Sequence, residues 1–215
     1  MPKKILKLAQ VFLIIFLLIE LYFPFRAIAD EIISHKQFPV LSDFETPFEM
    51  DRWNGDAKME KVDDFSHSGK ACTKILLTTD LYSGVSLSYF PRDWQGFRYL
   101  EFYLFSENNL RMTCRIHDDI HIKNREPFED RLNKRLFLHP GWNHVIIPIE
   151  EITTAPAGRE MNLKKIIRCE ISSIIDPQFN LMVFAFLKLA IYDAASDEYF
   201  YPIISYFPLL MYDGR

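Results

Sequence analysis

Apolar and polar residues alternate along most of this chain in short segments that are separated by turn residues. This alternation is typical of β-strands that bury one face and expose the other. No amphipathic helix of about ten to fifteen residues separates the segments, which favours antiparallel sheets over parallel strands with crossover helices. The sequence therefore predicts an all-β fold, a sandwich or a barrel, with strands in residues 68–80, 83–90, 96–106, 110–122, 130–141, 141–152 and 180–193.

Two further stretches combine helical and extended character. Residues 163–175 predict a short helical turn that leads into a strand. Residues 148–166 have some helical pattern, but Pro156 and Gly158 interrupt any long helix, so a loop with a turn is expected there.

The composition is that of a globular protein, with 49% hydrophobic and 25% charged residues among 215. This length suits one domain with attachments. Four of the 25 basic residues but only one of the 29 acidic residues precede residue 30, so the remainder holds 21 basic and 28 acidic residues. Such an acidic body argues against binding to a nucleic-acid backbone, which depends on lysine and arginine.

The first 29 residues have the three parts of an export signal. Basic residues come first, an apolar stretch follows, and Ala27–Ala29 supplies the small residues of a cleavage site. Cleavage there would leave Asp30 as the first residue. The alternative is an uncleaved membrane anchor, although the uninterrupted apolar run Val11–Ile19 ends at Glu20, short of the ~20 residues that a spanning helix prefers.

We expect four regions along the chain. Residues 1–29 are a signal peptide or signal anchor, residues 30–39 a short linker, residues 40–195 the β-domain, and residues 196–215 an apolar C-terminal extension that packs on the sandwich. The expected location is periplasmic, extracellular, or membrane-anchored and facing outward. Because the extension is too apolar for a solvated tail, it is also a candidate contact surface for a partner protein.

The three cysteines, Cys72, Cys114 and Cys169, are widely spaced and form no CxxC motif, so no zinc knuckle is indicated. An odd number leaves at least one free thiol. Because Cys114 and Cys169 occupy core-facing positions of predicted strands, we expect all three cysteines to be small buried hydrophobic residues.

The segment RIHDDIH places two histidines, two aspartates and an arginine within seven residues. From Met112 onward the even positions are apolar except Asp118, so they face the core, and Asp118 indicates a bulge or the end of the strand. The odd positions place four polar side chains in one row on the opposite face: Arg115, His117, Asp119 and His121.

Two neighbouring segments carry outward residues that suit a sugar. Parity places Tyr99, Glu101 and Tyr103 outward on one predicted strand, and Arg131 and Asn133 outward on another. If these strands share a sheet with the row, rings that stack on a sugar lie beside groups that hydrogen-bond its hydroxyls. The sequence therefore predicts a carbohydrate-binding face, with residues 121–133 closing one end of it.

Two other interpretations of the row stay open. His117, Asp119 and His121 could chelate a transition metal as two histidines and a carboxylate. Against this, the charge of Arg115 opposes a cation and no fourth ligand is evident. The row could also be an ordinary solvated strand face.

Five motifs in order resemble the galactose-binding-like β-jelly-roll domains, which include family-11-type carbohydrate-binding modules and the complex I intermediate-associated protein domain. They are VLSDFETPFEMDRW (40–53), FSHSGKACTKILL (65–77), FPRDWQGFRYLEFYLFS (90–106), LHPGWNHVIIPIEEI (138–152) and NLKKIIRCEI (162–171). Each motif is weak alone, and the resemblance covers about residues 40–189. It implies an antiparallel jelly-roll sandwich and, for an exported member, carbohydrate binding.

The resemblance also implies a structural calcium, an ion that prefers hard oxygen ligands. Glu45 matches the first ligand position, and backbone carbonyls around Gly69 or Lys70 match the second. Where the family has an aspartate in the last strand this chain has Ala185, and Asp193 lies eight residues later. Glu45, Lys70 and Asp193 are thus the candidate calcium positions, and no other cofactor is expected.

The sequence favours an exported, non-catalytic protein that binds a polysaccharide or oligosaccharide. The alternative is an envelope interaction or assembly module, because relatives without sugar binding act as chaperone-like or structural modules. An enzyme is not expected: no Ser-His-Asp, GxSxG, HExxH or P-loop pattern occurs, and adjacent carboxylates on a strand face opposite sides.

Overall fold

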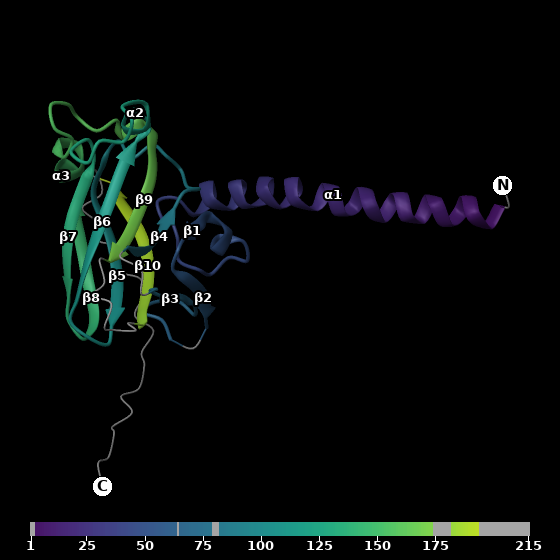
Figure 1. Cartoon of the computed structure of the whole chain (residues 1–215), viewed down its shortest axis with the longest axis horizontal. Helices are drawn as coiled ribbons and strands as arrows, with labels where there is room; N and C mark the ends of the chain where they lie inside the picture. The colour runs from purple at the N-terminus through teal and green to yellow at the C-terminus, as the bar shows by residue number, and fades with distance from the viewer. Residues whose placement is uncertain (1–2, 64, 79–81, 174–181, 194–215) are drawn as a thin grey trace, which may run out of the picture.

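Two β-sheets pack face to face, and one long helix projects from the side of this sandwich (Figure 1). The structure, a computed structural model, describes residues 3–63, 65–78, 82–173 and 182–193, with backbone alone for residues 3, 5, 6 and 182–193. Every strand pair in this part of the chain is antiparallel. The predicted all-β antiparallel sandwich is therefore confirmed.

Each sheet has five strands. The first, here called the β6 sheet, contains in spatial order β1 (Trp53–Gly55), β4 (Ser83–Leu87), β9 (Ile166–Ser173), β6 (Leu110–Asp118) and β7 (Leu132–Leu138). The second, the β5 sheet, contains β2 (Lys58–Val62), β3 (Cys72–Leu76), β10 (Met182–Asp193), β5 (Phe97–Ser106) and β8 (Gly141–Pro148). The consecutive strands β5 and β6 lie in opposite sheets, as do β7 and β8.

Alternate residues of the two sheets meet in the core between them. Cys114 and Ile116 of β6 are buried there, and so are Leu100, Phe102 and Leu104 of β5. These are the positions that strand parity assigns to the core. Burial of a large apolar side chain contributes about 1.5–3 kcal/mol, so this shared layer holds the sheets together. The three cysteines are free and buried, as expected.

Short helical segments lie near the ends of the strands: η1 (Glu49–Arg52), α2 (Asp119–Lys123), α3 (Ile149–Thr154) and η2 (Leu163–Lys165). Figure 1 shows α2 and α3 at the same end of the sandwich. η2 leads into β9, as predicted. The loop expected over residues 148–166 is wrong in its first part, because α3 forms there and buries Ile149 and Ile152.

α1 (Lys3–Gln37) is one continuous helix that runs through Pro24 and through the predicted cleavage site. It is long and apolar enough to cross a membrane, and its apolar part is not buried by the protein. It also occupies most of residues 30–39, where a linker was expected. The C-terminal extension, residues 196–215, lies outside the described residues.

The C-terminal half of α1 contacts the sandwich through two charged pairs. The buried guanidinium of Arg52 donates hydrogen bonds of 2.7–3.0 Å to the carboxylate of Asp30. Arg26, four residues earlier, pairs with Asp51 and lies over the ring of Phe48 at 4.9 Å. A buried charge without a partner is costly, so Asp30 fixes the end of α1 to the domain.

Asp118, the one polar residue at a core-facing position of its segment, is fully buried where β6 ends. Its carboxylate caps α2 by accepting the backbone N–H of His121 and also accepts the N–H of Asn162 at 2.6 Å. Two further hydrogen bonds, at 2.7 and 3.0 Å, come from Arg159, which pairs with Asp130 as well. Burial raises the pKa of Asp118, but these hydrogen bonds outweigh it and lower the pKa below its usual value. The strand end predicted at Asp118 is present.

We expect Asp118→Asn to lower the free energy of unfolding by about 3 kcal/mol, because Arg159 loses its buried charge partner. Urea unfolding near pH 7 measures this. The carboxylate stabilises the fold above its ordinary pKa of 3.8 and loses that effect as the pH falls through the lower folded pKa. The variant should therefore lose less stability than the wild type between about pH 7 and pH 3. An equal loss in both proteins would contradict this role.

Candidate functional site

The residues expected to form one carbohydrate-binding face are divided between the two sheets. The group on β5 belongs to one sheet: Tyr99, Glu101 and Tyr103. The group on β6 and at β7 belongs to the other: Arg115, His117, Arg131 and Asn133. The outer faces of a sandwich point in opposite directions, so one ligand on a face cannot contact both groups. The shared sheet assumed in the sequence analysis exists for β6 and β7 and not for β5.

Tyr103 is enclosed by other rings on the outer face of the β5 sheet. It stacks on His67, with ring centroids 3.8 Å apart, and on His144 at 4.3 Å. Its hydroxyl donates to Glu101 at 3.1 Å, and Glu101 also pairs with His144. Burial, and next the charge of Glu101, raise the pKa of Tyr103 to about 12. Because both faces of its ring are occupied, Tyr103 is not available to stack on a sugar.

Asp119 and His121 do not continue the row of Arg115 and His117. The strand ends at Asp118, and both residues lie in α2. Asp119 accepts hydrogen bonds from Lys123 at 2.6 Å and Asn162 at 2.9 Å. His121 is buried, with Nδ1 3.5 Å from Asp130. Within the described ranges, no group of three or more His, Cys, Asp or Glu side chains could hold a metal ion.

The outer face of the β6 sheet carries a continuous row of polar residues across all five strands. Strand pairing places one residue of each strand opposite the next, in the order Asn54, Ser86, Glu170, Arg115 and Asn133. In this central row Arg115 and Glu170 form an ion pair. Ser86 Oγ and Arg115 Nε are buried without a hydrogen-bond partner among the described residues. The row therefore holds polar atoms that no other described residue satisfies.

The rows on either side of the central row are also polar. On the α2 side His117 lies opposite Arg168, and on the other side Thr113 lies between Ser172 and Arg135. Near β4 the residues of the face are small and closely packed: Ser86 and Ser172 are buried, and a Cβ added at Gly84 would lie 2.5 Å from the Cβ of Ser172. The middle of the face thus has short side chains, with longer arginines around them.

His117 is a neutral hydrogen-bonding group on this face. Burial is the main cause that lowers its pKa, and the nearby charges of Arg168 and Arg131 lower it further. Its ring lies 4.7 Å from that of His121, which places it beside α2. Its Nδ1 donates to the carbonyl oxygen of Asp118 at 3.4 Å, so in the neutral ring Nε2 is the nitrogen that can accept a hydrogen bond.

Three exposed aromatic rings lie at the margins of the face, each beside an arginine. Tyr82 lies 5.8 Å from the guanidinium carbon of Arg115, Phe137 lies 5.8 Å from that of Arg111, and Phe128 lies 5.6 Å from that of Arg131. All three rings are more than half exposed: Tyr82, Phe128 and Phe137. Their exposed faces are available to the C–H side of a sugar ring.

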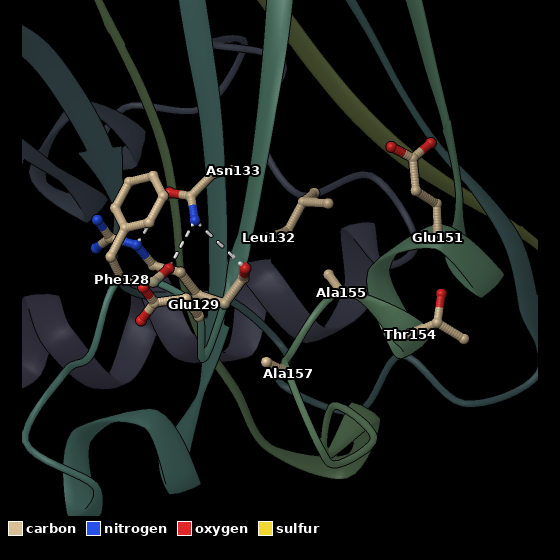
Figure 2. Close-up of a pocket in the computed structure, with 9 residues that line it drawn as sticks. Phe128, Glu129, Leu132, Asn133, Glu151, Thr154, Ala155 and Ala157 are labelled. Carbon is tan, nitrogen blue, oxygen red and sulfur yellow. Dashed lines mark hydrogen bonds between the residues drawn. The ribbon is translucent and has the colours of Figure 1, made fainter.

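A pocket of about 430 Å³ adjoins the face at the beginning of β7. Figure 2 shows Phe128, Glu129 and Asn133 on one side of it, and Glu151 and Thr154 of α3 on the other. Arg131 and Asn133 belong to both pocket and face, and Arg131 Nε donates to Asn133 Oδ1 at 3.1 Å. Asn133 Nδ2 donates to the carbonyl of Phe128 at 2.9 Å. Residues 121–133, predicted to close one end of a site, therefore supply one wall of this pocket.

The candidate calcium positions do not assemble as the resemblance implies. Glu45 Oε1 accepts the backbone N–H groups of Lys70 and Ala71 at 2.6 and 3.0 Å, so N–H groups rather than carbonyls face this carboxylate. In β10, Ala185 lies opposite Thr73. Asp193 is eight residues further along that strand, and at ~3.3 Å per residue it lies well beyond Glu45. The described residues thus do not fit a calcium site made of these three positions.

No family model matches the sequence, and no curated protein matches it. Among solved structures, the chain is similar to an exo-β-agarase, with 12% identity and a TM-score of 0.54 over 72% of this chain and 24% of that chain. It is similar to another agarase, with 13% identity and a TM-score of 0.50 over 70% of this chain and 26% of that chain. A family 11 carbohydrate-binding module from Clostridium thermocellum, in complex with a β-1,3-1,4-mixed-linked tetrasaccharide, matches with 16% identity and a TM-score of 0.49 over 70% of this chain and 94% of that chain.

These likenesses bear on the fold. The chain spans about a quarter of each agarase, so the resemblance concerns one β-sandwich part of those enzymes. The sandwich that the five sequence motifs imply is confirmed at this level. The function must be argued from the site itself.

Several residues of the face were missed in the sequence analysis. Strand parity in residues 166–173 was sufficient to place Arg168, Glu170 and Ser172 outward, because Cys169 and Ile171 are the buried positions. The sequence does not say that β9 lies between β4 and β6. Tyr82 and Phe128 precede β4 and β7 and carry no strand pattern of their own.

Tyr103 and Tyr99 provide a matched test of the outer face of the β5 sheet. We expect Tyr103→Ala to lower the free energy of unfolding by about 2 kcal/mol, because two stacked rings and a hydrogen bond lose their partner. Tyr99→Ala, at a residue 42% exposed on the same strand, should stay within about 0.5 kcal/mol of the wild type. Chemical denaturation measures both variants. Equal effects would mean that the ring cluster does not stabilise this face.

Proposed function

We propose that this chain is a non-catalytic carbohydrate-binding protein that binds a glycan across the outer face of the β6 sheet and in the adjoining pocket. The observation that carries the proposal is the central row, in which arginine, glutamate, serine and asparagine side chains cross all five strands. These groups hydrogen-bond the ring hydroxyls of a sugar, and the exposed rings at the margins suit its C–H faces. A row of polar groups that ends at a pocket suits an extended oligosaccharide.

The arrangement of carboxylates favours binding over catalysis. A glycosidase of the usual kind needs two carboxyl groups that flank one glycosidic bond, one of them free to deliver a proton. On the described strands of the face, Glu170 is the carboxylate present, and it is paired with Arg115. In the pocket, both oxygens of Glu151 are bonded to Lys134 at 2.7 and 2.8 Å. Glu170 and Glu151 are thus both engaged in ion pairs, and Glu129, the other carboxylate that lines the pocket, has no second unpaired carboxylate beside it in that lining.

The proposal is tested with the full chain in detergent micelles on an array of neutral and acidic oligosaccharides, with affinities then measured by calorimetry. We expect Tyr82→Ala and Phe128→Ala each to weaken binding by about tenfold, through loss of one stacking surface. Tyr99→Ala, an exposed aromatic on the opposite sheet, is the matched control and should leave the affinity unchanged. If the wild type bound no oligosaccharide on the array, or if all three variants lost affinity equally, the proposed binding face would be refuted.

The same array tests the calcium that the resemblance implies. It is run with added calcium and again with a chelator. Binding that disappears with the chelator would support a structural ion in contact with residues other than the three candidates. Equal binding in both conditions is the result expected from the contacts of Glu45.

We also propose that α1 is retained as a membrane anchor, with the sandwich facing out of the cytoplasm. Arg26 precedes the cleavage site at Ala27–Ala29 and contacts Asp51 and Phe48 of the folded domain. Removal of residues 1–29 would delete these contacts. Residues 8–25 of the helix, at 1.5 Å per residue, extend ~27 Å, close to the thickness of a hydrocarbon core.

Expression in a bacterium with a C-terminal affinity tag tests the retained anchor. We expect mass spectrometry of the purified protein to give a chain that includes residues 1–29, and the protein to stay with membranes after alkaline carbonate washing. A chain that begins at Asp30 in the soluble fraction would refute the anchor. Ala27→Leu, which removes a small residue of the cleavage site, should leave the mass pattern unchanged.

A further inference from the structure

The outer face of the β6 sheet is strongly basic, although the whole chain is acidic. Five arginines extend from the described parts of β6, β7 and β9 or from the residue just before β7: Arg111, Arg115, Arg131, Arg135 and Arg168. On the same strands Glu170 is the one carboxylate of the face. The chain as a whole has a formal charge of −4. Positive charge is therefore concentrated on this surface, whereas the protein as a whole carries a net negative charge.

The central arginines of the face are close enough to affect one another. Burial lowers the pKa of Arg131, and the charge of Arg115 lowers it further. Glu170 compensates part of this charge through its ion pair with Arg115. Arg115 Nε has no hydrogen-bond partner among the described residues. The charge of Glu126 also acts on Arg131, so two carboxylates stand against five guanidinium groups. This leaves an excess of positive charge and of hydrogen-bond donors, which an anionic ligand would relieve.

From this charge distribution we infer that the preferred ligand is an acidic polysaccharide, such as a polyuronate or a sulfated glycan; the inference rests on the carbohydrate binding proposed above. Guanidinium groups bind carboxylate and sulfate oxygens through paired N–H groups in one plane. The exposed rings at the margins supply contacts that depend on a sugar ring and not on charge alone. An acidic glycan uses both features, whereas a neutral glycan leaves the excess charge of the arginines unmatched.

The other common polyanion, nucleic acid, fits less well. Its affinity comes from neutralising many phosphates along an extended basic surface. Beyond residue 29 acidic residues outnumber basic ones by 28 to 21, so a long, densely charged chain that extended past the face would meet a net negative protein. The pocket at the end of the face also carries carboxylates, those of Glu129 and Glu151. These favour a ligand whose charges are spaced along sugar units with hydroxyls between them.

The test compares two forms of one polymer: polygalacturonate, and the same chain after full methyl esterification, which removes the charge and keeps the sugar. Affinity electrophoresis of the full chain in detergent should show retardation by polygalacturonate and little by its ester. The affinity should fall by about tenfold between roughly 20 and 300 mM NaCl, because salt screens exposed charges. Dextran sulfate serves as the sulfated probe, and single-stranded DNA as the anion without pyranose rings.

Charge-matched variants locate the effect on the face. Arg135→Gln and Arg168→Gln, both at exposed positions, should each weaken binding to polygalacturonate or dextran sulfate by about threefold to tenfold. Arg98→Gln removes the same charge from an exposed position on β5, in the opposite sheet, and should leave binding unchanged. Equal weakening by all three variants would mean a diffuse charge effect and would overturn the inference.

The outcomes separate this inference from the proposed function. Binding of neutral glycans that exceeds binding of both acidic probes would overturn the acidic preference and leave carbohydrate binding in place. Binding of DNA as tight as that of the acidic glycans would show a general polyanion surface and would overturn the preference as well. Absence of binding to any glycan, neutral or acidic, would overturn both.

Discussion

The buried ion pairs among Arg159, Asp118 and Asp130 decide where a site can form in this protein. Asp118 and Arg159 are 41 residues apart, and the fully buried carboxylate of Asp118 could not stay charged without the half-buried guanidinium except at a large cost. Their pairing ends β6, starts α2 and holds the chain before β7 against the segment before β9. The wall of the pocket and the position of Arg131 depend on this network. Asp118, the residue that interrupts the strand pattern, thus holds together the segments at this end of the sandwich.

Strand alternation produces two outer faces with different properties. On the β5 sheet, Phe65 and His67 from the segment before β3 pack on Tyr103, Phe105 and Trp142, so aromatic contacts cover that surface. On the β6 sheet the central row is polar on every strand, and the exposed rings of Tyr82, Phe128 and Phe137 lie at its margins. The first face is stabilised by its own side chains. On the second, the hydrogen bonds and charges of the outward groups are incompletely matched within the part of the chain that the structure describes, a condition that favours binding of a ligand.

The sequence was sufficient for local structure, because parity depends only on neighbouring residues. It placed Arg115 and His117 outward, placed Cys114 in the core and indicated a break at Asp118, and the structure agrees. The sequence was not sufficient to predict which strands pair with each other in a sheet. Nothing in the alternation of β5 and β6 says that consecutive strands cross to opposite sheets, so Tyr103 was expected on one sheet face with Arg115, whereas the two residues lie on different sheets. Nor does periodicity reveal that the chain after Asp118 turns into α2.

The position of α1 relative to the face gives the proposed binding a geometry. α1 contacts the sandwich next to β1, through Arg52 and Asp51, whereas β7 and the pocket form the opposite edge of the same sheet (Figure 1). If α1 lies in a membrane, the central row runs outward from the membrane side of the sandwich, and the pocket lies at its far end. A polymer outside the cell would then meet Phe128 and Arg131 first and extend along the row toward β1. The basic face would stand away from the anionic headgroups that otherwise compete for arginine, which favours a soluble acidic polymer as its partner.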